Sequence, residues 1–246
     1  MENAQLISLS RQMAIQRQMD VIANNLANIN TTGFKSESLL FEDYLSPTGE
    51  DESFTASRDQ DLHFTQDWST IHDLAAGPIE QTGNTLDVAL QGNGFLVVQT
   101  PAGERYTRAG SLQVDPSGTL VDVNGNPVLT DAGPMTFSLT ETDISIGANG
   151  AIATNEGPKG SLRLVEFPDA RALARTGDNL FSGTGAVAAT GTRVVQGSIE
   201  RSNVSGVTEI AGMIRVQRAY ASIASMMQRQ DEVLRGAIQR LGSLNA

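Results

Sequence analysis

The side chains that could carry out chemistry in this sequence are few, and their spacing does not favour it. Its two histidines, His63 and His72, lie in an acidic stretch without the spacing of a shared metal site. The absence of cysteine excludes disulfides, thiolate metal sites and cysteine nucleophiles. Carboxylates are abundant, so their closeness along the chain does not mark an acid–base pair. We therefore expect no catalytic residue and no metal site.

Two short motifs imitate ligand-binding loops. Residues 183–188 (GTGAVA) fit a dinucleotide loop formally, but Gly191 interrupts the helix that should follow. Residues 122–126 (DVNGN) resemble the start of a calcium loop. Pro127 and Gly133 then stand where such a loop needs a glycine and a glutamate. We expect no cofactor and no small-molecule substrate.

The charge distribution restricts the class of partner. The chain has 246 residues and a net charge of −11, which argues against nucleic acid because phosphate binding needs a basic face. The acidic excess lies in the middle of the chain, so the nearly neutral ends can pack against like ends. An ordinary solvated acidic surface is the alternative interpretation. Apolar runs are too short for membrane insertion, and charges within the first 20 residues argue against a cleaved signal peptide.

Proline and glycine divide the chain into segments. All eight prolines lie between Pro47 and Pro168, and no glycine precedes Gly33, so both ends are free to form long helices. The predicted class is α+β, with long N- and C-terminal helices packed as a coiled-coil-like pair and a mainly antiparallel β domain between them in the sequence. The predicted segments are an N-terminal helix (1–35), an extended linker with an acidic loop at 46–61 (36–85), a β-rich domain (86–200) and a C-terminal helix (201–246).

Each predicted helix carries an apolar stripe. The N-terminal stripe has the 4-3-4-3 spacing of a helix seam: Ile15, Met19, Ile22, Leu26 and Ile29. The C-terminal stripe repeats every seven residues: Met213, Tyr220, Met227, Leu234 and Leu241. Its alternate seam positions are mixed: Ile210, Gln217, Ala224, Asp231 and Ile238. We predict that the stripes pack against helices of other copies; a monomeric two-helix hairpin is the alternative.

The central segment has the pattern of short β-strands. Runs rich in β-branched residues occupy 95–99, 111–115, 119–123, 161–167 and 193–199. Asn-Gly pairs at 93–94, 124–125 and 149–150, with Asp115–Gly118, supply turn residues that tolerate positive φ. A compact antiparallel domain is therefore predicted.

The end of the N-terminal helix contains asparagines that its helical pattern does not need. Asn24 and Asn25 lie too far inside the helix to be capping residues, and each costs about 0.5 kcal/mol relative to alanine. Ala23 and Ala27 would let another helix approach closely, and the amides of Asn24 and Asn28 lie on one side of the helix. We therefore interpret this segment as an interface. Thr31, Thr32 and Gly33 are predicted to stop the helix, with Phe34 folded back on it.

Several motifs resemble the axial proteins of the bacterial flagellum, the family of rod, hook and hook–filament junction proteins. They are ANNLAN (23–28), TTGFK (31–35), SNV (202–204), VQRAY (216–220) and LDVALQGNGFLVV (86–98). The resemblance covers both ends and the first β region. Chain length, the lack of a long insertion after the first helix and segment 62–81 are most similar to a proximal rod subunit, with a distal rod subunit as the competitor.

The resemblance implies a structural subunit of the periplasmic rod in the flagellar basal body. Its implied partners are copies of itself, other proximal and distal rod proteins, and the flagellar type III export apparatus. The terminal helices would order on assembly and form the inner layer of a tube. The assembly residues would include both apolar stripes: Ile15, Met19, Ile22, Leu26, Ile29, Met213, Tyr220, Met227, Leu234 and Leu241. They would also include residues of the quoted motifs: Ala23, Asn24, Asn25, Ala27, Asn28, Thr32, Gly33, Phe34, Ser202, Asn203, Val204, Gln217, Arg218 and Ala219. Other classes left open are a secreted enzyme acting on peptidoglycan and a coiled-coil adaptor.

Overall fold

The computed structural model describes residues 2–46, 62–169 and 173–244. These residues form two compact units. Unit 1 contains residues 2–26, 37–46, 62–71 and 206–244, and unit 2 contains 27–36, 72–169 and 173–205. The acidic loop expected at 46–61 lies, apart from Ser46, outside the described residues. No helix in the described part of the chain is both long and apolar enough to cross a membrane.

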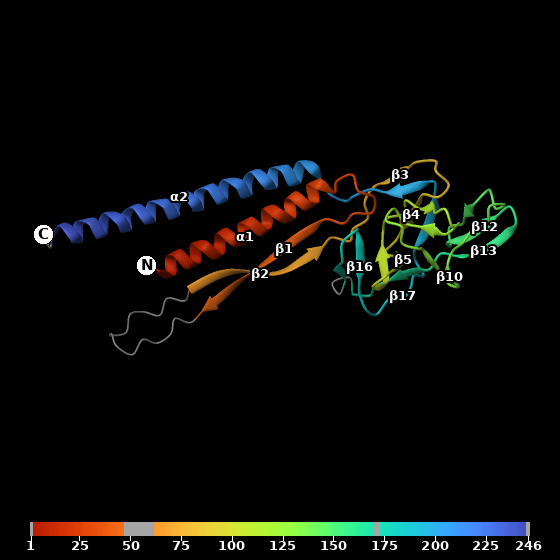
Figure 1. The fold of residues 1–246 in the computed structure, drawn as a ribbon, viewed down its shortest axis with the longest axis horizontal. Coiled ribbons are helices and arrows are strands. Elements are labelled where there is room, and N and C mark those ends of the chain that lie inside the picture. Colours follow the sequence, from red (N-terminus) through yellow and green to blue (C-terminus); the bar gives the residue numbers. More distant parts are fainter. Residues whose placement is uncertain (1, 47–61, 170–172, 245–246) are drawn as a thin grey trace. The chain divides into compact units, whose positions relative to one another are not determined.

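Unit 1 consists of two helices and a two-stranded sheet (Figure 1). Its elements are α1 (Glu2–Ala27), β1 (Glu37–Ser46), β2 (Leu62–His72, whose last residue belongs to unit 2) and α2 (Gly206–Leu244). The paired strands occupy the region expected to be an extended linker. Both strand sequences, ESLLFEDYLS and LHFTQDWSTIH, contain the aromatic and branched residues that favour β structure.

The end of α1 differs in detail from the predicted stop signal. The helix ends at Ala27, and the N–H of Thr31 then donates to the carbonyl of Asn28 at 3.1 Å. Gly33 has the predicted positive φ, +66°, but it lies in a second turn, where the N–H of Phe34 donates to the carbonyl of Thr31 at 3.3 Å, instead of directly capping the helix. The backbone therefore turns twice between α1 and the segment that follows it.

The predicted coiled-coil-like pair is wrong. The helices of unit 1 are antiparallel and differ in length, 26 against 39 residues, so the last turns of α2 extend past the start of α1 (Figure 1). Their contacts include polar ones: Gln12 Nε2 donates to the Tyr220 hydroxyl at 2.8 Å, and Asn25 Nδ2 lies 3.2 Å from Glu209 Oε1. A coiled coil needs a continuous apolar seam of interlocking side chains, and the described side chains of α2 interrupt that seam at the polar, exposed positions Gln217 and Asp231.

The predicted stripe of α2 is partly buried at Met213, Tyr220 and Met227, but the alternate seam positions are offset by one residue from the buried side. Val216 is buried, whereas the alternate seam residues Ile210, Gln217 and Asp231 are exposed. A Cβ placed on Gly212 would lie 3.5 Å from Ile22 Cδ1, so a small residue lets the helices approach there. The hairpin alternative describes the antiparallel arrangement, but other apolar residues of both helices, such as Met13 and Val207, stay exposed.

Unit 2 is built from short antiparallel strands. Its six-stranded sheet has the order β15-β16-β6-β5-β14-β17, and a three-stranded sheet has the order β11-β12-β13. The remaining pairs are β3 with β19, β4 with β18, β7 with β8, and β9 with β10. The bounds are β3 (Ile79–Gln81), β4 (Val88–Gln91), β5 (Phe95–Thr100), β6 (Gly103–Thr107), β7 (Gln113–Val114), β8 (Leu120–Val121), β9 (Leu129–Thr130), β10 (Gly133–Pro134), β11 (Ser145–Ile146), β12 (Ala151–Thr154), β13 (Gly157–Ser161), β14 (Leu164–Glu166), β15 (Ala174–Arg175), β16 (Leu180–Ser182), β17 (Val187–Ala188), β18 (Arg193–Gln196) and β19 (Ser198–Glu200).

Strand β5 separates the two hydrophobic cores of unit 2. Its alternate residues Phe95 and Val97 pack into one cluster, and Leu96 and Val98 pack into the other. Successive side chains of a strand point to opposite faces, so the uninterrupted apolar run FLVV matches a strand buried on both sides. The predicted strand at 95–99 is confirmed.

The predicted turns are confirmed at two of the three Asn-Gly pairs. Gly125 and Gly150 have φ values of +83° and +82°. At the third pair the positive φ belongs to Gly92, at +123°, instead of Gly94. A Cβ on Gly94 would lie 2.5 Å from Thr192 Oγ1, so close packing accounts for that glycine.

Candidate functional site

The buried carboxylates of unit 2 bind protein donors. Asp122, which begins the imitation calcium loop, accepts backbone N–H bonds from Asn124 and Asn126, both at 2.8 Å, through Oδ1. Asp87 accepts from Thr82 Oγ1 at 2.7 Å and from Asn84 Nδ2 at 3.1 Å. No group of three or more possible metal ligands occurs among the described residues. These acids stabilise turns.

Of the other candidates for chemistry, His72 is placed as a structural residue. His72 packs edge-on against Phe181, with ring centroids 5.6 Å apart, while the side chain of His63 lies outside the described part of the chain. Residues 183–186 connect β16 to β17, which consists of residues 187–188. Because no helix follows that loop, it lacks the helix N-terminus that a dinucleotide loop uses to bind phosphate.

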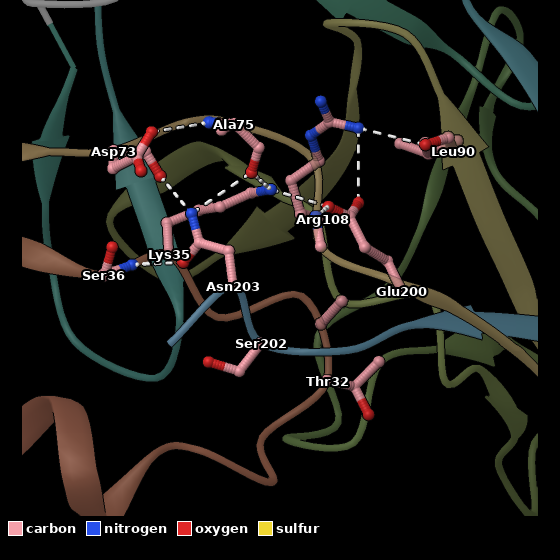
Figure 2. A network of polar contacts seen from close by, with 12 residues as sticks. Thr32, Lys35, Ser36, Asp73, Ala75, Leu90, Arg108, Glu200, Ser202 and Asn203 are labelled. Carbon is pink, nitrogen blue, oxygen red and sulfur yellow. Dashed lines mark hydrogen bonds and ion pairs between the residues drawn. The ribbon is translucent and has the colours of Figure 1, made fainter. Parts of the chain in front are cut away.

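A buried charged cluster joins distant parts of unit 2 (Figure 2). Lys35 Nζ lies 2.6 Å from Glu200 Oε1, and both side chains have no exposed surface. Arg108 Nη1 lies 3.4 Å from Glu200 Oε2. The N–H of Gly77 also donates to Glu200 Oε1 at 2.9 Å. One carboxylate therefore binds two cations and a backbone donor.

The cations of this cluster are held without access to solvent. Lys35 Nζ donates to the carbonyl of Ala75 at 2.7 Å, and Arg108 donates to the carbonyls of Leu90 and Gly92. Burial lowers the pKa of Lys35, and the bond to Glu200 opposes that shift. Burial likewise lowers the pKa of Arg108. Breaking such a buried group by removing one partner costs about 3–5 kcal/mol.

The residues of the TTGFK motif are packed inside unit 2. The N–H of Gly33 donates to the Glu200 carbonyl at 2.7 Å, and a Cβ on Gly33 would lie 2.4 Å from the Arg108 carbonyl carbon. Phe34 is buried, with the Arg175 guanidinium 4.1 Å from its ring centroid. Asn179 Nδ2 donates to the Thr32 carbonyl at 2.8 Å.

The SNV motif lies against the same segment (Figure 2). Asn203 Oδ1 accepts the N–H of Ser36 at 2.8 Å, and its Nδ2 donates to the Asp73 carbonyl at 2.8 Å. Ser202 and Val204 are buried, and the N–H of Val204 donates to Ser202 Oγ at 3.2 Å. These motif residues, expected at an interface between subunits, make their described contacts within one subunit.

Asn25 is likewise bound by groups of the same subunit, in unit 1. It is 2% exposed, and its amide exchanges two bonds of 2.9 Å with the backbone of Glu37. Its Nδ2 also lies 3.2 Å from Glu209 Oε1 in the first turn of α2. This asparagine therefore joins the end of α1 to the start of β1 and the start of α2.

The remaining predicted assembly residues divide by exposure. Those exposed in the subunit are Ala23, Asn24, Ala27, Gln217, Arg218 and Ala219. Ile22 is buried, and Ile15, Met19, Leu26, Asn28, Ile29, Met213, Tyr220 and Met227 are half-buried. The side chains of Leu234 and Leu241 lie outside the described part. Leu9 and Met13, which continue the N-terminal apolar pattern on a second face, are exposed, and so are four apolar residues of α2 outside the predicted stripe: Val207, Ile214, Met226 and Val233. Their apolar character outside the main stripe was the sequence feature that could have marked them as assembly residues.

Three family profiles match the chain in order. Residues 6–35 match the flagella basal body rod protein family, 89–154 match the flagellar hook protein FlgE/F/G D1 domain, and 195–240 match the flagellar basal body rod FlgEFG protein C-terminal family. The buried cluster contains one residue from each matched segment: Lys35, Arg108 and Glu200.

Whole-length relatives agree with these profiles. The chain is 38% identical to the flagellar basal-body rod protein FlgF of Caulobacter vibrioides over 100% of both chains. It is 32% identical to FlgF of Mesorhizobium japonicum over 99% of both. It is 34% identical to FlgG of Bacillus subtilis over 89% of this chain and 91% of the relative. The chain therefore belongs to the FlgE/F/G family of flagellar basal-body rod and hook proteins.

Proposed function

We propose that this chain is a structural subunit of the flagellar basal-body rod, of the FlgF or proximal type, that assembles with its own copies and with other rod proteins. The FlgF relatives from Caulobacter and Mesorhizobium support that type because they align over the whole chain. The FlgG relative from Bacillus leaves about a tenth of this chain unaligned. Because its identity is comparable, a distal rod subunit is the second candidate.

The observation that carries the proposal is the apolar surface left exposed on the helices of unit 1. Val207, Val233 and Met13 are 83%, 69% and 65% exposed. Ile210 and Ile214 follow Val207 on the same side of α2, at intervals of three and four residues. Burying these side chains against other subunits would supply a favourable free energy that one subunit lacks.

Assembly would proceed by association of terminal helices. The rod would stabilise the ordered helices by mass action, since a partner that binds only the ordered form shifts the equilibrium toward it. Export through the flagellar type III apparatus, with the helices disordered before assembly, is part of this proposal.

The competing enzymatic function has less support. A peptidoglycan hydrolase needs carboxyl groups that are available to substrate. The buried acids of the described residues, Asp87, Asp122, Glu141 and Glu200, each accept hydrogen bonds from protein groups. We therefore propose that the chain is not an enzyme.

Deleting the gene and restoring it tests the proposal. Basal bodies isolated from the deletion strain should have incomplete rods by electron microscopy, and plasmid expression of the chain should restore complete rods. Complete rods in the deletion strain would overturn the proposal. The length of the remaining rod separates the two candidates, because a distal subunit leaves the proximal rod in place.

A further inference from the structure

The buried cluster collects one charged side chain from each of three segments that are far apart in the sequence. Lys35 precedes the β domain, Arg108 follows β6, and Glu200 ends β19. The carbonyl of Glu200 also accepts the N–H of Gly33, and Asn203 binds Ser36. The segment that leads from α1 is therefore held by the segment that leads into α2, both within unit 2 (Figure 2).

The strand order shows which parts of unit 2 must pair before the N-terminal segment can contact residues 198–203. The first strands of unit 2, β3 and β4, pair with the last strands, β19 and β18. The six-stranded sheet uses strands between Phe95 and Ala188 and includes none of these four. That sheet can form from nearer segments, whereas closing the N-terminal segment onto residues 198–203 requires the longest loop, which carries the largest entropic cost.

We propose that Lys35, Arg108 and Glu200 form a completion latch, which anchors residues 27–36 only when strands β18 and β19 have closed unit 2. The segment that follows α1 and the segment that precedes α2 are then held together only after the whole of unit 2 has folded. The latch rests on the proposed function, since its use is to keep incompletely folded subunits from joining a rod.

Electrostatics make the latch selective for the complete arrangement. Without Glu200, the buried Lys35 ammonium would lose the carboxylate that it contacts and would still face the charge of the Arg108 guanidinium, with only Asp73 of the described residues left as an opposing charge, which is strongly unfavourable. Opening residues 27–36 to water relieves that cost. Burial already lowers the pKa of Lys35 even with Glu200 present, in agreement with a site that tolerates this ammonium only when it is paired.

Hydrogen exchange of the purified full-length protein, followed by mass spectrometry, tests the latch. Glu200→Gln should raise exchange of residues 27–36 by about 100-fold or more, while residues 95–107 change by less than about twofold. Glu80→Gln is the matched control, because it removes a carboxylate from the partner strand β3 whose pair with Arg201 is solvent-exposed. It should leave residues 27–36 protected.

Lys35→Met and the double variant complete the test. Lys35→Met leaves Glu200 paired with Arg108 and should release residues 27–36 less than Glu200→Gln does. The double variant should exchange no faster than Glu200→Gln alone, because the two residues act as one unit. If Glu200→Gln does not fold, Lys35→Met carries the comparison.

Unchanged exchange of residues 27–36 in these variants would overturn the latch. A uniform increase throughout residues 72–200 would overturn it as well, since the cluster would then serve general stability. These experiments use the isolated subunit, so their failure would leave the proposed rod function untouched. Failure of the deletion experiment would remove that function and leave the exchange result unaffected.

Discussion

Asn25 pairs with the backbone of Glu37 in both directions. Its Oδ1 accepts the Glu37 N–H at 2.9 Å, and its Nδ2 donates to the Glu37 carbonyl at 2.9 Å. Two such bonds, at about 1 kcal/mol each, offset the roughly 0.5 kcal/mol that asparagine costs in a helix. The amide is thus kept inside α1 because it orients the strand that follows.

This relationship predicts a specific pattern of suppression. Asn25→Asp keeps the acceptor but removes the donor, and it places a carboxylate beside Glu209. We expect motility to fall, since an unpaired Glu37 carbonyl and a like-charge contact cost about 1–3 kcal/mol. Adding Glu209→Gln supplies a donor and should restore swimming in soft agar.

Asn24→Asp serves as the matched control for that pair. It makes the same chemical change one residue earlier, at an exposed position. Glu209→Gln should not restore any motility lost through Asn24→Asp. Equal suppression at both positions, or normal swimming of the Asn25→Asp strain, would contradict the intramolecular role of Asn25.

Two glycines with similar backbone conformations should respond differently to alanine. Gly33 has φ +66°, and its added Cβ would meet the Arg108 backbone at 2.4 Å. Gly83 has φ +76° and no atom within 4 Å of its added Cβ. Gly83→Ala should lower the free energy of unfolding by about 1 kcal/mol, and Gly33→Ala by several times that value. Urea unfolding followed by circular dichroism measures both, and equal losses would refute the close approach.

Acid should destabilise unit 2 partly through Glu141. The Lys159 ammonium at 2.7 Å, followed by the Ser138 N–H, holds the pKa of Glu141 below its ordinary value of 4.5. The stabilisation is therefore present above about pH 4.5 and is lost as the pH falls through the lowered pKa. Glu141→Gln should flatten the decline of the free energy of unfolding below about pH 5.

A matched control for this pH dependence is Glu104→Gln. Glu104 pairs with Arg163 at 2.8 Å, but both side chains are about 40% exposed, so the pair contributes little to stability. If the free energy of unfolding of Glu141→Gln declined with falling pH as steeply as that of the unaltered protein, this carboxylate would not be bound as the structure indicates.

Apolar residues on α2 and on unit 2 should differ in their importance for assembly. Ile214→Asp places a charge on the exposed apolar side of α2, and we expect it to stop rod completion without changing the stability of unit 2. Val123→Asp makes the same change at a turn of unit 2 where the side chain is 60% exposed, and it should leave rods complete. Electron microscopy of basal bodies reads out both, and the opposite ranking would place assembly on unit 2.

Periodicity and turn chemistry in the sequence predict some elements but not others. The FLVV run and the Asn-Gly turns predict β5 and its neighbours, and the ends without proline predict α1 and α2. Strands of two residues, such as β7 and β8, are too short for alternation to reveal their exact bounds. The strands β1 and β2 contain residue types that favour strands, but the acidic loop between them led to the prediction of an extended linker.

The buried cluster could not be predicted from the local pattern. Lys35 follows a helix stop, where a lysine is ordinarily exposed. Its partner Glu200 is separated from it by 165 positions and lies on β19, which pairs with β3, so the contact depends on long-range strand pairing. The contact of Asn25 with Glu37 spans only twelve residues, but predicting it required the strand β1 to be recognised in the sequence.

The central claim, that this chain builds the rod through its terminal helices, is tested most directly by a cryo-electron microscopy map of basal bodies containing it. We expect density for the chain in the rod, with the exposed side of α2 around Val207, Ile210 and Ile214 buried against a neighbouring subunit. Density for the chain with that side facing solvent, or a complete rod without the chain, would contradict the account.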